Sequence, residues 1–224
     1  QPFGHGLDDP VAIGKQADVS AGGARGDALG KLGHHEAAGF DLAFHGAVGD
    51  GHLIDALLAY FADVRKRVAT QKELCEQRDI TMVTIVDDAY PQSLRGIANA
   101  PAVLWVWGVI PDAAHSAVAV VGTRQCTHQY GRPVTELLGQ EWCARGAAIV
   151  SGLANGIDTI AHESTLRNGG RTVAVIASGI DRITPLPAKH LAWRIVEHGG
   201  AVVSEHPCGV AALPPYFPAR NRII

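Results

Sequence analysis

The sequence predicts an α/β protein with an extended Rossmann-like fold, in which a parallel sheet carries helices on both faces. From about residue 117 onward, short apolar runs alternate with longer segments of helical periodicity. Strands that are separated by helices of about ten or more residues form parallel sheets. Four of the apolar runs end in turns rich in glycine or hydroxyl-bearing residues. In a parallel sheet such turns lie together at one edge, where ligands bind.

The first 51 residues differ in composition from the rest of the chain. They hold nearly half of its 26 glycines and show weak apolar periodicity. Glycine raises the entropy cost of ordering a chain, so we expect residues 1–51 to form a loose or disordered segment. In residues 52–77, apolar side chains recur at helical spacing, which predicts an amphipathic helical segment of one or two helices. We expect the Rossmann-like domain to occupy residues 78–224.

The elements of this domain follow from apolar runs and periodicity. We expect two early strands, Ile80–Val86 and Val103–Trp107. Ala117–Val121 is continuously apolar, as in a strand buried on both faces. The elements expected after it are, in order, helix Gly131–Arg145, strand Ala147–Val150, helix Ile157–Arg167, strand Thr172–Ile176, helix Ala188–His198 and strand Ala201–Val203. The first of these helices carries an apolar stripe at Val134, Leu137, Leu138 and Trp142.

Bulk properties exclude several classes of protein. The net charge of −3 argues against a chain coated in positive charge, so a nucleic-acid site must be a local patch. The 4 cysteines are far apart and form no C-x-x-C pair, which argues against a zinc site or a redox dithiol. No apolar run approaches the ~20 residues that cross a bilayer, and the N-terminus does not resemble a signal peptide. We expect a soluble, cytoplasmic protein without metal or cofactor.

The turns at the strand ends are suited to phosphate. Dinucleotide oxidoreductases carry G-x-G-x-x-G after the first strand and an acidic residue after the second, and this chain has neither. Glycine instead lets the backbone approach an anion, hydroxyls can donate hydrogen bonds, and an arginine can bind phosphate through two nitrogens. The candidate residues are Gly122, Thr123, Arg124, Ser151, Gly152, Gly156, Ser178 and Gly179.

Nothing in the sequence requires a chemical reaction. No nucleophile elbow of the G-x-S-x-G type precedes a helix. Asp158 and His162 lie four residues apart on a predicted helix, where such a pair more often steadies the helix start than performs catalysis. Near the end of the sequence, Arg220 and Arg222 could reach an anionic backbone or form surface salt bridges, and spacing alone leaves both open.

Eight motifs in a fixed order resemble the DprA (Smf) family of DNA-processing proteins. They are Tyr-Pro-Gln-Ser-Leu-Arg at 90–95, Ala-Pro-Ala-Val-Leu at 100–104, Gly-Thr-Arg at 122–124, Tyr-Gly at 130–131, Ser-Gly-Leu-Ala-x-Gly-Ile-Asp-x-x-Ala-His at 151–162, Gly-Gly-x-Thr-x-Ala-Val at 169–175, Ser-Glu-x-Pro-x-Gly at 204–209 and Phe-Pro-x-Arg-Asn-Arg-Ile-Ile at 217–224. The resemblance covers residues 74–224, and we expect the sequence to be a C-terminally truncated fragment.

The resemblance implies a role in natural transformation without enzymatic activity. Such proteins bind and protect incoming single-stranded DNA, help to load the RecA recombinase, and form homodimers. In these proteins the DNA pocket lies at the strand ends, and its key arginine corresponds to Arg124. Its glycines correspond to Gly122, Gly152, Gly156 and Gly179, and the terminal Arg-Asn-Arg motif corresponds to Arg220, Asn221 and Arg222.

This chain departs from the family pattern at two places. Asn155 stands where the family usually has an arginine, which removes one positive charge from the strand-end turns. In the next loop, Thr184-Pro185 stands where the family usually has Tyr-Pro, and Ala188 stands where an asparagine is usual. Lys189 can supply the basic side chain often found there. Two alternatives remain for the same turns: a nucleotide-processing enzyme similar to phosphoribohydrolases, whose Pro-Gly-Gly-x-Gly-Thr-x-x-Glu motif is missing here, and a sensor of a nucleotide signal.

Overall fold

The computed structural model of the protein describes residues 52–111, 116–183 and 185–224. The expected loose segment, residues 1–51, lies outside the described residues. Residues 65–224 form one compact unit, and the described part of the other unit is the beginning of helix α2 (His52–Glu76). The helical segment predicted for residues 52–77 is therefore one continuous helix of 25 residues.

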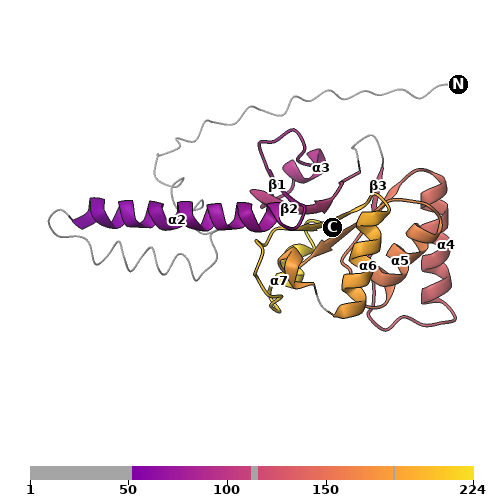
Figure 1. The fold of residues 1–224 in the computed structure, drawn as a ribbon. Helices are drawn as coiled ribbons and strands as arrows, with labels where there is room; N and C mark the ends of the chain where they lie inside the picture. Colours follow the sequence, from indigo (N-terminus) through magenta and orange to yellow (C-terminus); the bar gives the residue numbers. More distant parts are fainter. Residues whose placement is uncertain (1–51, 112–115, 184) are drawn as a thin grey trace, which may run out of the picture. The chain divides into compact units, whose positions relative to one another are not determined.

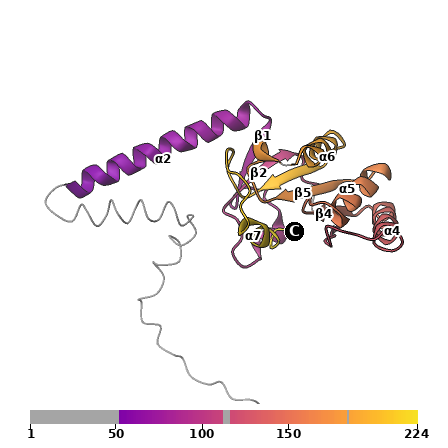
Figure 2. The ribbon, with the colours of Figure 1, turned by 90° about the horizontal axis from the view of Figure 1, so that it is seen from below.

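A sheet of six strands, in the order β1-β2-β6-β5-β4-β3, forms the centre of the compact unit (Figures 1 and 2). Its strands are β1 (Ile80–Thr84), β2 (Val103–Gly108), β3 (Ala117–Ala119), β4 (Ala148–Ser151), β5 (Thr172–Ile176) and β6 (Ala201–Ser204). Strands β3 to β6 are parallel, whereas β2 pairs with both β1 and β6 in antiparallel fashion. The predicted Rossmann-like α/β fold is confirmed, with an antiparallel pair of strands added beside β6.

Three helices connect the parallel strands and lie side by side (Figures 1 and 2). They are α4 (Gly131–Ala144), α5 (Ile157–Arg167) and α6 (Leu186–Glu197). Each ends just before a glycine with positive φ: Gly146 at 73°, Gly169 at 69° and Gly199 at 75°. The residue after each glycine donates its N–H back into the last helical turn, as Ala147 does to the Trp142 carbonyl at 3.0 Å. These glycines fix where each helix stops and the chain turns toward the next strand.

The two faces of the sheet carry separate apolar cores, because alternate residues of each strand point to opposite sides. On one face, Ala174 and Ile176 of β5 pack with Leu191 and Ile195 of α6. On the other face, Val173 and Val175 belong to a second cluster that includes Tyr90, Leu104 and Ile223. The second face is covered by short α3 (Gln92–Arg95), by α7 (Tyr216–Arg220) and by the residues that follow α7. Both faces are covered, as predicted, but by layers of unequal size.

Strand β3 and helix α4 are more exposed than the sequence predicts. In the described part of the chain, β3 pairs with β4 alone and lies at the edge of the sheet, and Val121 after it is 63% exposed. The expectation of a strand buried on both faces is therefore wrong. On α4, Leu137 and Leu138 of the predicted apolar stripe are 57% and 42% exposed. An apolar run does not reveal whether its strand takes a central or an edge position.

Two cysteines that are distant in sequence meet in the core of the compact unit. Cys75, near the end of α2, and Cys208, after β6, are both buried and free, and they belong to the same core cluster. Burial raises the pKa of Cys208 to about 11. The Gln71 side chain also bonds the backbone N–H and carbonyl of Cys208, at 3.0 and 3.1 Å. The packing of the two cysteines and the hydrogen bonds of Gln71 join the end of α2 to the loop after β6.

Candidate functional site

Because strands β3, β4, β5 and β6 are parallel, their C-terminal ends lie along the same side of the sheet. We call this row of strand ends the carboxyl edge. Residues 122–124 follow β3, residues 152–156 follow β4, and residues 178–179 follow β5. Helix α7 reaches the same edge, because the Arg220 side chain bonds the Gly152 carbonyl. The structure thus brings together the turns that the sequence analysis singled out.

Glycine allows the turns after β3 and β4 to touch. A Cβ on Gly122 would lie 2.5 Å from the side chain of Ile157, the first residue of α5. Gly156 has φ of 87°, and a Cβ there would collide with the carbonyl of Thr123. The Ile157 N–H donates to this same Thr123 carbonyl at 3.1 Å. These glycines serve close packing between the turns, and the packing fixes the position of Arg124 next in the chain.

Asp158 ties the carboxyl edge together from beneath. Its Oδ2 accepts hydrogen bonds from the backbone N–H groups of Gly152 at 3.1 Å and Ala154 at 3.4 Å. Burial raises the pKa of Asp158, while these hydrogen bonds and the Arg220 cation lower it. Asp158 therefore holds the loop before α5, but it does not cap the helix itself, and the pair with His162 that the sequence suggested is not formed. The Asp158 carboxylate occupies N–H groups that would otherwise face an anion.

Arg220 lies inside the protein rather than on its surface. It is 5% exposed, and its Nη1 donates to the carbonyls of Gly152, at 2.8 Å, and Val175. Gly152 leaves the room for it, since a Cβ there would lie 2.5 Å from the guanidinium. Burial lowers the pKa of Arg220, and the charge of Asp158 opposes this shift. Arg220 therefore neither faces an external anionic backbone nor forms a surface salt bridge, the two roles that the sequence left open. It has a structural role inside the protein.

Arg222 and Asn221, which follow Arg220, also have partners within the protein. The Arg222 guanidinium pairs with both carboxylate oxygens of Glu205, and its Nε donates to the Asn99 carbonyl at 3.0 Å. The hydrogen bond to Glu205 raises the pKa of Arg222. The Asn221 side chain accepts a bond from Arg220 Nε at 3.3 Å. Of the alternatives for Arg222, the salt bridge is the one formed.

The serines at the strand ends donate inward. The Ser151 hydroxyl bonds the Val120 carbonyl at 2.6 Å and joins the ends of β3 and β4. The Ser178 hydroxyl bonds the Gly179 carbonyl at 3.2 Å, and the Gly179 N–H donates to the Val210 carbonyl at 2.8 Å. Both serines are buried. The expectation that they offer hydroxyl donors to an outside anion is not met, because buried hydroxyls satisfy nearby carbonyls first.

Arg124 is the predicted side chain that best fits an external anion. It is exposed, and within the described ranges no carboxylate pairs with its guanidinium, whose recorded contact is the ring of Phe217, 5.7 Å from the ring centroid. Thr123 is also exposed, and its Oγ1 accepts the Gln125 N–H at 3.2 Å. Lys189 lies exposed on α6. A cation on the turn after the first parallel strand can contact a phosphate at this edge.

Sequence reasoning missed two residues of the carboxyl edge. In the sequence, Phe217 stands out only as part of a motif, yet its ring contacts Arg124, which lies about ninety residues earlier in the chain. His206 stacks on Tyr216, with ring centroids 4.2 Å apart. The spacing of residues in the sequence does not predict such contacts, because the two residues of each pair belong to different parts of the fold. Among the described residues, no group of three or more His, Cys, Asp or Glu side chains could hold a metal ion.

His162 is buried and neutral. Its Nδ1 lies 2.7 Å from Thr172 Oγ1, and the Thr172 hydroxyl donates to the Ile149 carbonyl, so His162 donates and carries its proton on Nδ1. Burial, with a smaller effect of the Arg220 cation, lowers the pKa of His162 from 6.5 to about 3. His162 therefore joins α5 to β5 and does not pair with Asp158.

Stability is expected to fall as the pH drops below 6.5, because the unfolded chain then binds a proton that folded His162 excludes until about pH 3. Above this window His162 is neutral in both states and contributes no pH dependence. Within it, one such group changes the free energy of unfolding by about 1.4 kcal/mol per pH unit. Urea unfolding between pH 7 and 5 should show a shallower dependence in His162→Gln, with a remainder from His206, whose pKa burial also lowers. Equal slopes in the two proteins would contradict this assignment.

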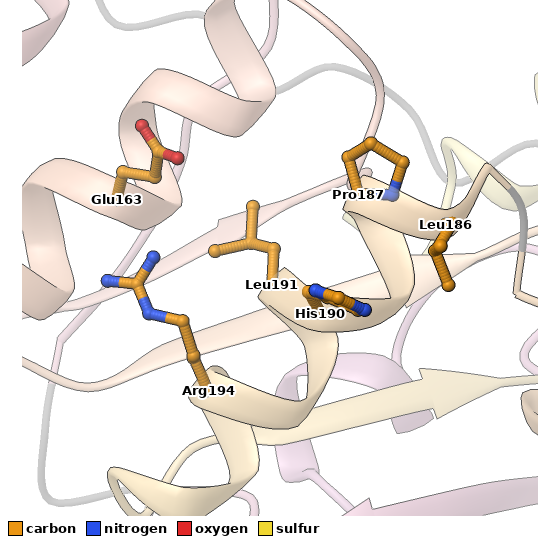
Figure 3. Close-up of a pocket in the computed structure, with 6 residues that line it drawn as sticks. All are labelled: Glu163, Leu186, Pro187, His190, Leu191 and Arg194. Carbon is orange, nitrogen blue, oxygen red and sulfur yellow. The ribbon is translucent and has the colours of Figure 1, made fainter.

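A pocket of about 320 Å³ lies between α5 and α6 (Figure 3). Leu186, Pro187 and Leu191 give it apolar walls, and Glu163, His190 and Arg194 surround them. None of the predicted phosphate-binding residues lines it. The carboxyl edge therefore remains the candidate site.

Comparison with known proteins identifies the family. The family model of DNA recombination-mediator protein A matches residues 81–224. The chain belongs to this family. It is 41% identical over 141 residues to DNA processing protein DprA of Streptococcus pneumoniae, and 38% identical over 161 residues to protein Smf of Escherichia coli. These matches cover 63% and 70% of this chain, but only 49% and 42% of the relatives. The chain thus spans about half the length of the curated relatives it matches.

Two solved structures resemble the fold. The S. pneumoniae DprA structure matches with a TM-score of 0.56 and 41% identity, over 64% of this chain and 50% of that one. DNA processing protein A of Helicobacter pylori matches with a TM-score of 0.55 and 27% identity, over 65% of this chain and 64% of that one. The latter structure is described as giving insight into a unique single-stranded DNA binding mode. Among the described residues of our chain, no helix is long and apolar enough to cross a membrane.

Proposed function

We propose that this chain binds single-stranded DNA at the carboxyl edge of its sheet, with Arg124 contacting the phosphate backbone. The observation that carries the proposal is Arg124 itself. Its exposed guanidinium stands on the first turn of the parallel sheet, and no described carboxylate neutralises it. An unpaired arginine at this edge can donate two parallel hydrogen bonds to a phosphate. The single-stranded DNA binding described for the H. pylori relative supports the same ligand.

The other predicted contacts divide into two groups. Thr123 and Lys189 are exposed and join Arg124 as proposed contacts, with the Gly122 backbone beside them. The other predicted residues support the edge through the hydrogen bonds and close packing described above. They are Ser151, Gly152, Gly156, Ser178, Gly179, Arg220, Asn221 and Arg222. We therefore expect fewer residues to contact the DNA directly than the motifs imply, and most of them to lie in the turn after β3.

In the whole protein we propose a role as a recombination mediator in natural transformation. It would protect incoming single-stranded DNA, help to load RecA, and act as a cytoplasmic homodimer without catalysing a reaction. Family membership supports this role. Ser151, Ser178 and His162 agree with it, because these three polar side chains are buried and bonded inside the protein.

A salt titration tests the DNA-binding proposal. We expect the chain to bind an unstructured oligonucleotide of mixed sequence with an affinity that falls steeply between low and moderate salt, since phosphate contacts release counterions. AMP and ATP serve as competitors in the same fluorescence anisotropy assay, and they should not displace the oligonucleotide at micromolar concentration. Tight mononucleotide binding or turnover, without DNA affinity, would favour a nucleotide sensor or a nucleotide-processing enzyme instead.

A further inference from the structure

We infer that Phe217 is a positioning residue that holds Arg124 ready for a phosphate, an inference that rests on the proposed function of this edge. The Arg124 guanidinium carbon lies 5.7 Å from the centroid of the Phe217 ring. A guanidinium over an aromatic face is attracted by the ring quadrupole. The contact joins the turn after β3 to helix α7, which lies near the other end of the described sequence.

Phe217 is itself held firmly. It belongs to α7, whose last residue, Arg220, is buried and bonds the carbonyls of Gly152 and Val175. Two residues later, Arg222 pairs with both oxygens of Glu205 after β6. The ring therefore sits on a short helix anchored to the ends of β4, β5 and β6. A fixed ring can restrain a mobile side chain, whereas a ring on a free loop could not.

The position of Arg124 needs such a restraint. The buried Arg220 cation is close enough that the Arg124 charge lowers its pKa, so the two guanidinium groups repel each other. No described carboxylate offsets this repulsion at Arg124. The ring of Phe217 supplies an attraction without cancelling the positive charge. A salt bridge would also fix the side chain, but it would compete with phosphate for the same nitrogens.

Pre-ordering has a defined consequence for binding. A free arginine loses much rotamer freedom when it contacts a ligand, and restraint before binding reduces this loss. Removal of the ring should therefore weaken DNA binding while leaving the number of phosphates contacted unchanged. A Phe217 variant should bind DNA more weakly but keep the salt slope of the parent chain. An Arg124 variant should lose both affinity and salt slope.

Phe217→Leu tests the inference, since it keeps an apolar side chain of similar length but lacks the ring. Its affinity for an unstructured oligonucleotide should fall roughly two- to fivefold, with the salt slope of the parent chain. Phe217→Trp, whose ring attracts cations more strongly, should retain or exceed the parent affinity. Trp142→Leu is the matched control: Trp142 lies in the last turn of α4, at the opposite end of the strands from these turns, and loss of its ring should leave affinity unchanged.

Two further measurements separate positioning from a general structural effect. In an Arg124→Ala background, Phe217→Leu should cause no further loss of affinity. In the free protein, the Nε–Hε resonance of Arg124 should move when Phe217 becomes leucine, because the ring current is lost. Parent affinity in Phe217→Leu, beside a clear loss in Arg124→Ala, would overturn the positioning role and leave the proposed function standing. Failure of the parent chain to bind DNA would remove both.

Discussion

Replacing Arg124 with alanine is expected to weaken binding to single-stranded DNA by roughly ten- to a hundredfold at low salt, the usual value of a hydrogen-bonded charge contact. The same change should reduce the slope of log affinity against log salt by about 0.7, because one fewer phosphate charge is neutralised on a single strand. Anisotropy titrations at several salt concentrations measure both quantities. The free energy of unfolding should change little, since the Arg124 side chain is exposed and its contact is with the Phe217 ring.

Arg145→Ala is the matched control for this experiment. Arg145 is the C-cap of α4, at the end of the strands opposite the carboxyl edge, and its side chain is 71% exposed. The Arg145→Ala substitution removes the same charge as Arg124→Ala. A general effect of net charge would weaken DNA binding equally in both variants. A local phosphate contact predicts loss in Arg124→Ala alone. Equal affinities and equal salt slopes in Arg124→Ala and the parent chain would show that the DNA lies elsewhere.

The departure at Asn155 bears on the size of this effect. Asn155 is exposed on the turn after β4, next to Gly156, whose backbone packs against the carbonyls of Thr123 and Arg124. An arginine in its place would add a second cation beside Arg124. With asparagine there, Arg124 provides a larger share of the charge at this edge. This is why a single substitution should alter the salt slope measurably.

The sequence predicted the parallel part of the fold well, since its signals are local. Helix α5 and strand β5 have the predicted bounds, because a buried apolar run and a helical period identify such elements directly. Glycines at 146, 169 and 199 place the helix ends. The edge position of β3 was not predictable in this way, because the same apolar run suits a central strand and an edge strand.

The sequence identified the residues of the carboxyl edge but not the directions of their side chains. Ser151 and Ser178 have the residue type that a phosphate site needs, yet each hydroxyl donates to a carbonyl one strand or one residue away. Arg220 and Arg124 are equally cationic in sequence, and only packing makes one internal and the other exposed. Residue type and spacing specify what can bind an anion, whereas burial decides which groups remain available to do so.

Arg220→Ala should destabilise the fold far more than any exposed arginine substitution. It leaves the Gly152 and Val175 carbonyls without their donor and the buried Asp158 without its nearby cation. A buried acceptor left without its donor typically costs about 1–3 kcal/mol, and two carbonyls lose their donor here. For a chain of this size, that cost lowers the melting temperature by roughly 10 °C. Circular dichroism melts of Arg220→Ala and of Arg145→Ala, which should melt with the parent, measure the difference.

The cause of this loss can be separated into cavity and charge. Arg220→Met fills most of the space but restores no donor, so it should recover the part of the loss that comes from the cavity. Adding Asp158→Asn to Arg220→Met should recover more, because no uncompensated carboxylate then remains buried. Acid should act in the same direction: without the Arg220 cation the pKa of Asp158 rises further, and protonation of its carboxylate as the pH falls narrows the difference in stability from the parent. If Arg220→Ala melts with the parent at pH 7, the buried guanidinium does not hold α7 to the sheet, and Phe217 then has no fixed base from which to position Arg124.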